Sequence, residues 1–582
     1  MFNSSNKKIT NFTHPFLQPS NSTHRQYEAL RAYFVDGLPS KQAAKRFGYT
    51  EGSFRVLVHE FRKNPHRQFF LPPAKGPHKA PKNDKLRSNI IALRKQNLSI
   101  YDISDVLKTE GHKMSPVNIS LILKQEGFAR LPRRRDEERP PGPHPTKAQV
   151  ADVRQFDLSP RHFRTKFGGL FLFVPYLASM PFDHILKQAN LPGSKMVPAG
   201  HAVRSLLALK LFGSARKSHV MSYVLDQGLA LFAGLNAIPK RAFFTEYSCR
   251  INPNCYPKLM QLWFDAMRNL GIQRGTSFDL DFHTIPFHGE NALVEKHYVS
   301  KRSRKQKGIL AFLAQDASTR VFCYANAHLR KDTQNDEILR FIEFWKKRTG
   351  ALPEELIFDS KLTTYKNLNK LNQMGIHFIT LRRRSKKMLQ EINNEPISAW
   401  SRIELQSVSS IYRKPRILDR KILLKDYEGP IRQMVIAELG HEDPTFLVTN
   451  QLTRSAPKLV QRYAQRMVIE NNIEDGIDFF HMDALSSAVA MKVNFDLHLT
   501  LMASSLYRLF SQTIGNGYEH AKSRDIFRYF IDATAKVNIT ENEIIVHFQK
   551  RAHNPFLIAS GFDQTDIPIP WLGRKNLQFI FG

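Results

Sequence analysis

The chain has little cysteine, relatively few acidic residues and no long uninterrupted apolar run. Its three cysteines, Cys249, Cys255 and Cys323, form no CxxC pair and have no suitably spaced histidines. The sequence therefore favours plain thiols in a reducing compartment over a zinc site or a disulfide framework. The most apolar run, 168–182, is broken by two prolines and is too short to cross a bilayer. We expect a protein without membrane spans.

Two further features are missing from the sequence. The first residues are polar and lack the apolar core of a signal peptide, so we expect a cytoplasmic location. No Walker-type glycine loop appears, so we expect no nucleotide cofactor.

Positive charge is what the chain has in excess. It contains 86 Lys and Arg against 52 Asp and Glu in 582 residues, a formal net charge of +34. Such an excess is typical of a protein that binds a polyanion, because every neutralised phosphate releases counterions. We expect double-stranded DNA as the partner, and no membrane. The length is too great for one core and indicates several domains.

The N-terminal part has the spacing and caps of a helix-turn-helix unit. Helices are expected over 26–36, 41–47 and 51–63, with a glycine after each of the first two and Thr50 as the cap of the third. In this arrangement the third helix enters the major groove. We expect DNA contacts from Ser53, Arg55, Arg62 and Lys63; a small helical bundle without DNA is the alternative.

A second unit of three helices follows a basic, proline-rich linker. Its last helix is expected to begin after Ser115 with Pro116 at its first position. We expect Val117 on the core side of that helix with Ile119, Ile122 and Leu123. The residues expected outward, toward DNA, are Asn118, Ser120 and Lys124.

The composition shifts define an expected order of segments in a multidomain α/β chain. The segments are a flexible tail (1–23), helix-turn-helix 1 (24–66), a basic linker (67–84), helix-turn-helix 2 (85–130), a second linker (131–149), a helical domain (150–272), the first part of a catalytic core (273–381), a β-rich insertion (382–449), the second part of the core (450–515) and a C-terminal tail (516–582).

The predicted core has the element order of an RNase H-like fold. Three strands, a helix, a strand, a helix and a strand are expected between 277 and 381, which gives a mixed sheet joined by right-handed crossovers. In that order the first and fourth strands are neighbours. Asp281 in the first and Asp359 at the end of the fourth are thereby brought together.

Each of these aspartates has an alternative reading. Asp279 lies on the same face of its strand as Asp281 and competes with it as the first acid; we favour Asp281. Asp359 has the alternative role of a helix cap.

The third acid is expected from the stretch 463–470. On one helix Tyr463, Arg466 and Glu470 follow the i, i+3, i+7 spacing and point the same way. The alternative for Arg466 and Glu470 is an i, i+4 salt bridge on a solvated face.

Three carboxylates from two strands and one helix fit a site for two Mg²⁺ ions, with Mn²⁺ able to substitute. Such ions, about 4 Å apart, neutralise the charge that develops in phosphoryl transfer. We expect Asp281, Asp359 and Glu470 to be the metal ligands and catalytic acids, and Arg466 to hold a phosphate or orient a carboxylate.

Several nearby charges have no single interpretation. Four acids follow Glu470 as surface charges or as groups that support the site: Glu474, Asp475, Asp478 and Asp483. His481 is expected to be structural. The run Arg382, Arg383 and Arg384 is expected to face DNA, with a solvated surface as the alternative.

At these residues the chain resembles the DDE transposases of bacterial insertion sequences, in the branch with a Tyr-x-x-Arg-x-x-x-Glu signature and a β-rich insertion before the glutamate. The resemblance covers roughly 276–510. It implies that Asp281, Asp359 and Glu470 are the catalytic triad and that Tyr463 and Arg466 are its signature partners. The branch usually has a lysine seven residues after the glutamate, where this chain has Ile477.

The resemblance implies a bacterial, nucleoid-associated transposase. It would bind terminal inverted repeats, cleave DNA with Mg²⁺ and transfer the freed strand, as a homodimer or larger assembly on DNA. Two other functions stay open: a DNA-binding regulator without catalysis, and a stand-alone nuclease of the same fold.

Overall fold

A computed structural model describes residues 16, 18–19, 21–67, 69–70, 81–129, 131, 149–287, 294–299, 304–362, 364–406, 414–438, 443–483 and 490–582. The chain divides into two compact units, residues 1–144 and residues 145–582. The tail and the two linkers expected from the sequence lie largely outside the described residues.

The first helical module contains α2 (Ser22–Phe34), α3 (Ser40–Arg46) and α4 (Glu51–Lys63). Small and aromatic side chains fill its core, among them Ala29, Ala43 and Phe54. The Thr50 side chain accepts a hydrogen bond of 3.2 Å from the backbone N–H of Ser53, so the expected cap of the third helix is present.

The second module contains α5 (Pro81–Lys95), α6 (Ile100–Thr109) and α7 (Pro116–Gln125), with Ser115 as the cap of α7. Ile119, Ile122 and Leu123 are buried as expected. Val117 is 68% exposed, so its expected place in the core is wrong. The three buried residues form one stripe of the helix, and a residue two positions before that stripe lies on the opposite side.

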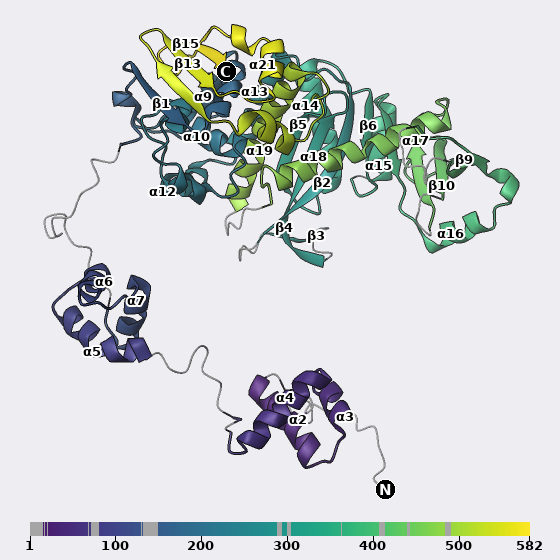
Figure 1. Ribbon diagram of the computed structural model, residues 1–582. Coiled ribbons are helices and arrows are strands. Elements are labelled where there is room, and N and C mark those ends of the chain that lie inside the picture. Colours follow the sequence, from purple (N-terminus) through teal and green to yellow (C-terminus); the bar gives the residue numbers. More distant parts are fainter. Residues whose placement is uncertain are drawn as a thin grey trace. The chain divides into compact units, whose positions relative to one another are not determined.

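Residues 277–449 of the second unit are organised by one mixed sheet (Figure 1). Its core strands are β2 (Ser277–Pro286), β3 (Lys296–Val299), β4 (Arg304–Asp316), β5 (Phe322–Leu329), β6 (Glu355–Phe358) and β7 (His377–Leu381). The strand order β4-β2-β6-β7, with β5 beside β4, is the order expected from the sequence. The β2–β6 and β6–β7 pairs are parallel. The short strand β3 was not expected.

The insertion continues this sheet. Strand β11 (Thr445–Thr449) pairs antiparallel with β7, and β10 (Ile431–Ala437), β9 (Arg416–Ile422) and β8 (Ser401–Arg402) follow outward. Helix α16 (Lys386–Asn393) lies within the insertion. The β-rich segment therefore extends the hydrogen-bonded sheet of the core.

Helices cover both faces of the sheet. Successive side chains of each strand point to opposite faces, so apolar residues are available on both. Phe278 and Phe358 pack with α14 (Glu337–Thr349) and α15 (Tyr365–Gln373). Ile357 and Ile379 point the other way and pack with α17 (Ala456–Gln465). Helix α18 (Met467–Asp478) follows α17 and lies against β2. Figure 1 shows α17 and α18 crossing the sheet.

A second sheet joins the two ends of this unit, in the order β1-β12-β13-β15-β14. Strand β1 (Arg161–Thr165) precedes the mixed sheet in sequence, whereas β12 (Ala535–Ile539), β13 (Glu543–Phe548), β14 (Ile567–Pro568) and β15 (Asn576–Phe581) follow it. The guanidinium of the fully buried Arg204 lies 4.6 Å from the ring centroid of Trp571. Residues 516–582, for which the sequence indicated no role, thus share a core with residues 150–272.

Helices complete that core. They are α8 (Val174–Ala178), α9 (Phe182–Gln188), α10 (Ala199–Leu211), α11 (Gln227–Ala233), α12 (Arg241–Tyr247), α13 (Cys255–Asn269), α19 (Ala490–Ile514), α20 (Ser523–Ile526) and α21 (Asn554–Ala559). Among the described residues, no single helix has both the length and the apolar character needed to cross a membrane; one pair bent by 70°, residues 168–178 with 182–188, meets these criteria by length and composition alone.

Candidate active site

Two aspartates meet at the end of the β2–β6 pair. The parallel ladder ends with Leu280 opposite Phe358. Asp281 and Asp359 are the next residue on each strand, and neighbouring strands lie about 4.8 Å apart. The Asp359 carboxylate accepts a 2.5 Å hydrogen bond from the backbone N–H of Ser360. The following helix α15 is capped by Thr364, so Asp359 does not act as its cap.

Arg466 connects the aspartate on β2 with the glutamate on α18. Its Nη1 lies 3.5 Å from Asp281 Oδ2, and its Nη2 donates a 2.6 Å hydrogen bond to Glu470 Oε1. The i, i+4 salt bridge is therefore present, but the arginine side chain is only 11% exposed. The buried arginine bridges the largely buried Asp281 and the half-exposed Glu470.

The helix that provides these residues is interrupted, whereas the sequence predicted one continuous helix. α17 ends at Gln465, α18 begins at Met467, and Arg466 lies between them. Its backbone N–H donates to the carbonyl three residues earlier, as in a tighter 3₁₀ turn. Arg466 keeps helical φ and ψ angles, so Tyr463 and Glu470 stay close to the expected face.

The three carboxylates line one open cavity of about 880 Å³. Its wall is formed by Asp281, Phe282, His283, Thr284, Lys296, His297, Lys305, Leu310, Lys331, Gln334, Asp359, Lys361, Leu362, Arg383, Glu470, Ile473, Glu474, Ile477 and Asp483. The cavity lies beside residues 281–286 of β2, which extend past the end of the β6 ladder. Segments almost 200 residues apart in sequence thus face one space.

The charges around this cavity perturb one another. Burial, together with the nearby charges of Glu470 and Asp359, raises the pKa of Asp281 to about 6 against the opposing effect of Arg466. Burial acts to lower the pKa of Arg466, but the surrounding tyrosine and carboxylates outweigh it and the pKa is raised. Burial raises the pKa of Tyr463 to about 12. A cluster of this kind in a cavity is typical of a functional site.

The comparison with known families agrees with this geometry. Residues 273–506 match the family model of the transposase DDE domain. These residues form a transposase DDE domain. The match includes all three carboxylates and supports a transposase function for the chain. A search of curated proteins found no match.

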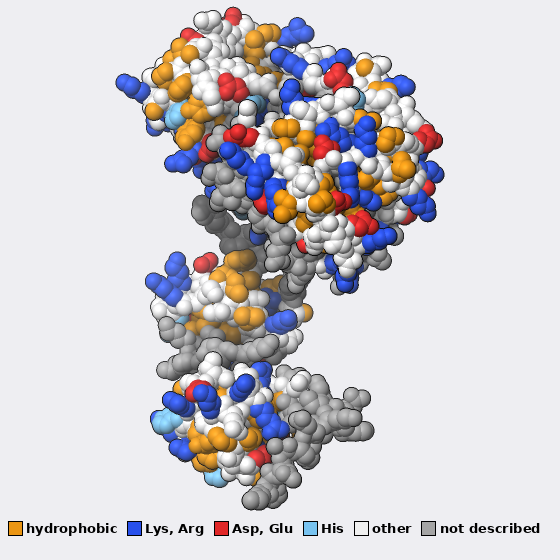
Figure 2. Space-filling view, turned by 90° about the vertical axis from the view of Figure 1, so that its right-hand side faces the viewer, with side chains coloured by type: hydrophobic (Ala, Val, Ile, Leu, Met, Phe, Trp, Pro, Cys, Tyr) orange, Lys and Arg blue, Asp and Glu red, His pale blue; other side chains and the backbone are white. Residues whose placement is uncertain are grey.

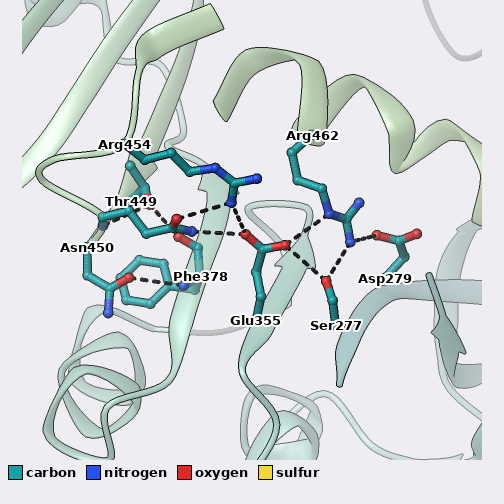
Figure 3. A network of polar contacts seen from close by, with 9 residues as sticks. Ser277, Asp279, Glu355, Phe378, Thr449, Asn450, Arg454 and Arg462 are labelled. Atoms are coloured by element: carbon teal, nitrogen blue, oxygen red, sulfur yellow. Dashed lines mark hydrogen bonds and ion pairs between the residues drawn. The ribbon is translucent and has the colours of Figure 1, made fainter. Parts of the chain in front are cut away.

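A second group of charges in the DDE domain is buried, and Figure 3 shows its contacts. Arg462, one helical turn before Arg466, donates to Asp279 Oδ1 at 2.9 Å and to Glu355 Oε2 at 3.0 Å. Ser277 donates to the same Glu355 oxygen at 2.9 Å. The rival first acid, Asp279, is 2% exposed and does not line the cavity. We name this group, Asp279, Glu355 and Arg462, the clamp.

The two carboxylates of the clamp differ in their pKa. Burial raises the pKa of Asp279, and the one hydrogen-bond donor Arg462, together with the charge of Arg466, only partly opposes the effect. Burial also acts to raise the pKa of Glu355, but hydrogen bonds and charges from Gln451, Arg462, Ser277 and Arg454 outweigh it and the pKa is lowered. The number of donors around each carboxylate explains the difference.

The donor set of the DDE domain fits divalent metal ions in its chemistry. DDE transposase domains generally use such ions, and carboxylate oxygens are the ligands that Mg²⁺ prefers. Across the described ranges, no three His, Cys, Asp or Glu side chains lie close enough together to hold one ion. The Arg466 guanidinium lies between Asp281 and Glu470, so this cation has to leave before a metal ion can be shared by both.

The other charges predicted near the site have different places. Asp483 Oδ1 lies 2.8 Å from His283 Nε2, and both line the cavity. Glu474 also lines it. Asp475 accepts a 3.0 Å bond from the backbone of Ser523, away from the cavity. His481 contacts the Gly213 carbonyl at 3.1 Å, in agreement with a structural histidine.

The arginine run after β7 is split among three environments. Arg382 donates to the Gln433 side chain at 2.7 Å. Arg384 pairs with Asp443 at 3.4 Å. Arg383 is exposed and lines the cavity. The structure thus brings only the middle arginine to the candidate site.

Sequence reasoning missed the clamp and the lysines of the cavity. One signal for the clamp was present: Glu355 begins a strand whose other residues are apolar, and a charge in a buried strand requires a partner. No comparable signal marked Lys296, Lys305 or Lys331, because they reach the cavity through the unexpected strand β3 and its surroundings.

Proposed function

We propose that the protein is a DNA transposase of the bacterial insertion-sequence type that cleaves and rejoins DNA at this cavity. The observation that carries the proposal is the convergence of Asp281, Asp359 and Glu470 on one cavity within a transposase DDE domain. The protein would bind terminal inverted repeats, hydrolyse a phosphodiester to free a 3′ hydroxyl, and direct that hydroxyl to target DNA.

Each residue of the cavity has a role in this proposal. Asp281, Asp359 and Glu470 would hold two Mg²⁺ ions, or Mn²⁺ in their place. When bound, such ions neutralise charge on the attacking and leaving oxygens. Arg466 would leave the carboxylates and hold a phosphate by its planar pair of donors. Tyr463 would pack beside the terminal nucleotide.

The N-terminal modules would recognise the element ends. Helices α4 and α7 have the size that fits a major groove. Their polar residues proposed for DNA contact are all exposed: Ser53, Arg55, Arg62, Lys63, Asn118, Ser120 and Lys124. Two modules on one chain suit a long, bipartite site. Because two ends have to be joined, we expect a dimer or larger assembly on DNA.

Substitution of the three acids tests the proposal. Asp281→Asn, Asp359→Asn and Glu470→Gln should each reduce Mg²⁺-dependent cleavage of element-end DNA by about a thousandfold or more, since several kcal/mol of transition-state stabilisation is lost. Binding to the same DNA in a mobility-shift assay should not change, because the modules at residues 24–130 are intact.

The matched control is Asp563→Asn, an exposed aspartate outside the cavity, which should cleave like the wild type. Full cleavage by any one acid variant would remove that residue from the site. Wild-type protein that binds the ends but never cleaves them would favour the regulator. Cleavage without strand transfer would favour the stand-alone nuclease.

A further inference from the structure

Five cations line the same cavity as the three carboxylates. They are Lys296 on β3, Lys305 on β4, Lys331 after β5, Lys361 after β6 and Arg383 after β7. All five side chains belong to exposed residues. Lys and Arg are also spread widely over the face shown in Figure 2, so exposure and charge alone do not distinguish this set.

Their position distinguishes these five cations, because all of them line one cavity. Among the described residues, none of the five cations has an ion-pair partner, whereas arginines of the insertion do: Arg402 and Arg416 share Glu438 at 2.9 and 2.6 Å. Four of the five acids of the cavity have a basic partner: Asp281 and Glu470 share Arg466, Asp483 contacts His283, and Glu474 pairs with Lys522. The cavity therefore has positive charge available for an anion that the described residues do not provide.

Three of the cations form one group at the β3–β4 hairpin. In this hairpin Lys296 is opposite Lys307, and Lys305 is two residues from Lys307 on the same strand. Lys296 and Lys305 therefore lie on one face of the hairpin. The backbone N–H of Lys331 donates a 2.9 Å hydrogen bond to Glu295 Oε2, next to Lys296 in sequence. We name Lys296, Lys305 and Lys331 the lysine wall.

The buried His297 shows that the lysine wall is compact. Burial lowers the pKa of His297, and the charge of Lys331 lowers it further against the effect of Glu295. The Lys331 ammonium is thus close enough to the hairpin to act on one of its side chains.

The lysine wall lies on one side of the carboxylates. Asp281 is opposite Leu313 on β4, and Lys305 lies eight residues away along that strand, a distance of at most about 27 Å at roughly 3.4 Å per residue. Lys361 and Arg383 follow β6 and β7, on the other side of β2 in the sheet. Across the sheet, the carboxylates therefore lie between the lysine wall on one side and Lys361 and Arg383 on the other.

We propose that the lysine wall binds backbone phosphates of the DNA on one side of the cleaved bond, up to about eight nucleotides from it, given the roughly 3.4 Å rise per nucleotide. The inference rests on the proposed function, because it places the scissile phosphate at the three acids. DNA is the anion whose regular charges match an elongated row of cations. Ile477, which lines the cavity without charge, provides no such contact.

The test compares a triple variant, Lys296→Gln, Lys305→Gln and Lys331→Gln, with the full-length wild type. Binding to element-end DNA is measured as a function of salt, with Ca²⁺ in place of Mg²⁺. Each phosphate contact adds about 0.9 to the slope of log K against log salt. The slope should therefore fall by about two to three in the triple variant.

Substrates with one truncated flank give the sharper result. On DNA that lacks the flank bound by the lysine wall, the triple variant and the wild type should bind alike. On DNA that lacks the opposite flank, the full difference should remain. The matched control is Lys346→Gln on α14, exposed and outside the cavity, and the triple Lys→Arg variant should restore the slope.

An unchanged slope, or the same loss on both truncated substrates, would overturn the inference. These binding measurements need no cleavage. If the wild type never cleaves DNA, the proposed function fails while the lysine wall is still tested. If the wild type cleaves and the triple variant binds every substrate normally, only the lysine wall fails.

Discussion

The DDE domain contains two arginine–carboxylate groups that lie next to each other in the sequence of β2, β6 and the α17–α18 segment. The clamp takes Asp279 from β2, Glu355 from β6 and Arg462 from α17. The cavity group takes Asp281 from β2, Asp359 from the residue after β6 and Glu470 from α18. Its arginine, Arg466, lies one helical turn after Arg462. The two arginine side chains are almost equally buried, at 10% and 11% exposure.

The two groups differ in how far their carboxylates are exposed to solvent. In the clamp, the side chains of Asp279 and Glu355 are 3% and 11% exposed. In the cavity group, those of Asp281 and Glu470 are 19% and 49% exposed. A carboxylate that is buried and paired with a protein cation stabilises the fold and is not accessible to a substrate. One that is half satisfied and open to a cavity can accept a metal ion or substrate, as catalysis requires.

The largest effect expected from this comparison is on stability. Arg462→Met leaves two buried carboxylates without their shared cation, so the free energy of unfolding should fall by about 3–5 kcal/mol. Arg466→Met should cost less, about 1–2 kcal/mol, because water in the cavity solvates Glu470. Denaturant unfolding of the two variants, followed by a probe in the DDE domain, measures the contrast.

Arg524→Met, at an exposed arginine of α20, is the matched control and should leave stability nearly unchanged. Equal losses for Arg462→Met and Arg466→Met would show that the two groups do not differ in the way their burial indicates.

The second effect depends on pH. Because the pKa of Asp281 is raised to about 6, the folded protein keeps this proton at pH values where the unfolded chain has lost it. The contribution of this proton to the free energy of unfolding is fully present below about pH 4 and is lost as pH rises through 6. Asp281→Asn cannot ionise, so in EDTA it should gain up to about 3 kcal/mol relative to the wild type between pH 4 and pH 7.

Unfolding free energies of the two proteins across this range measure the gain, and Asp563→Asn should stay parallel to the wild type. If the curve for Asp281→Asn stays parallel to that of the wild type, the Asp281 carboxyl group of the wild type has an ordinary pKa.

The sequence predicts the open group better than the closed one, for a physical reason. Asp281 lies in an alternating strand and Asp359 directly after an apolar one, and the order of the strands makes these two neighbours. Glu470 lies at helical spacing from Arg466. These are local patterns. The clamp depends on the register between β2 and β6 and on the approach of α17, which only the packed sheet determines.

The same limit explains the errors. The interruption at Arg466 changes one backbone hydrogen bond and leaves the periodicity of the side chains intact, so no pattern marks it. The segment 516–582 has apolar residues whose partners lie more than 300 residues away, as Trp571 packs on Arg204. Contacts that distant have no signature within a sequence window.

The smallest expected effect concerns Arg466 and metal binding. The guanidinium lies where a cation shared by Asp281 and Glu470 would have to be, so a divalent ion has to displace it. Arg466→Gln removes this competitor, and the affinity of the DNA-free protein for Mg²⁺ should rise by about tenfold or less, roughly 1 kcal/mol. Titration calorimetry, or the rise in unfolding temperature on adding Mg²⁺, measures the change.

The contrast with two other variants makes this prediction specific to the cavity. Glu470→Gln removes a carboxylate and should weaken Mg²⁺ binding, whereas Arg462→Lys alters only the clamp and should leave it unchanged. The sign for Arg466→Gln is decisive, because an arginine that organises the carboxylates for metal would weaken binding when it is lost. A weaker affinity would therefore assign Arg466 to the support of the metal site and reject the competition inferred from its position between the two acids.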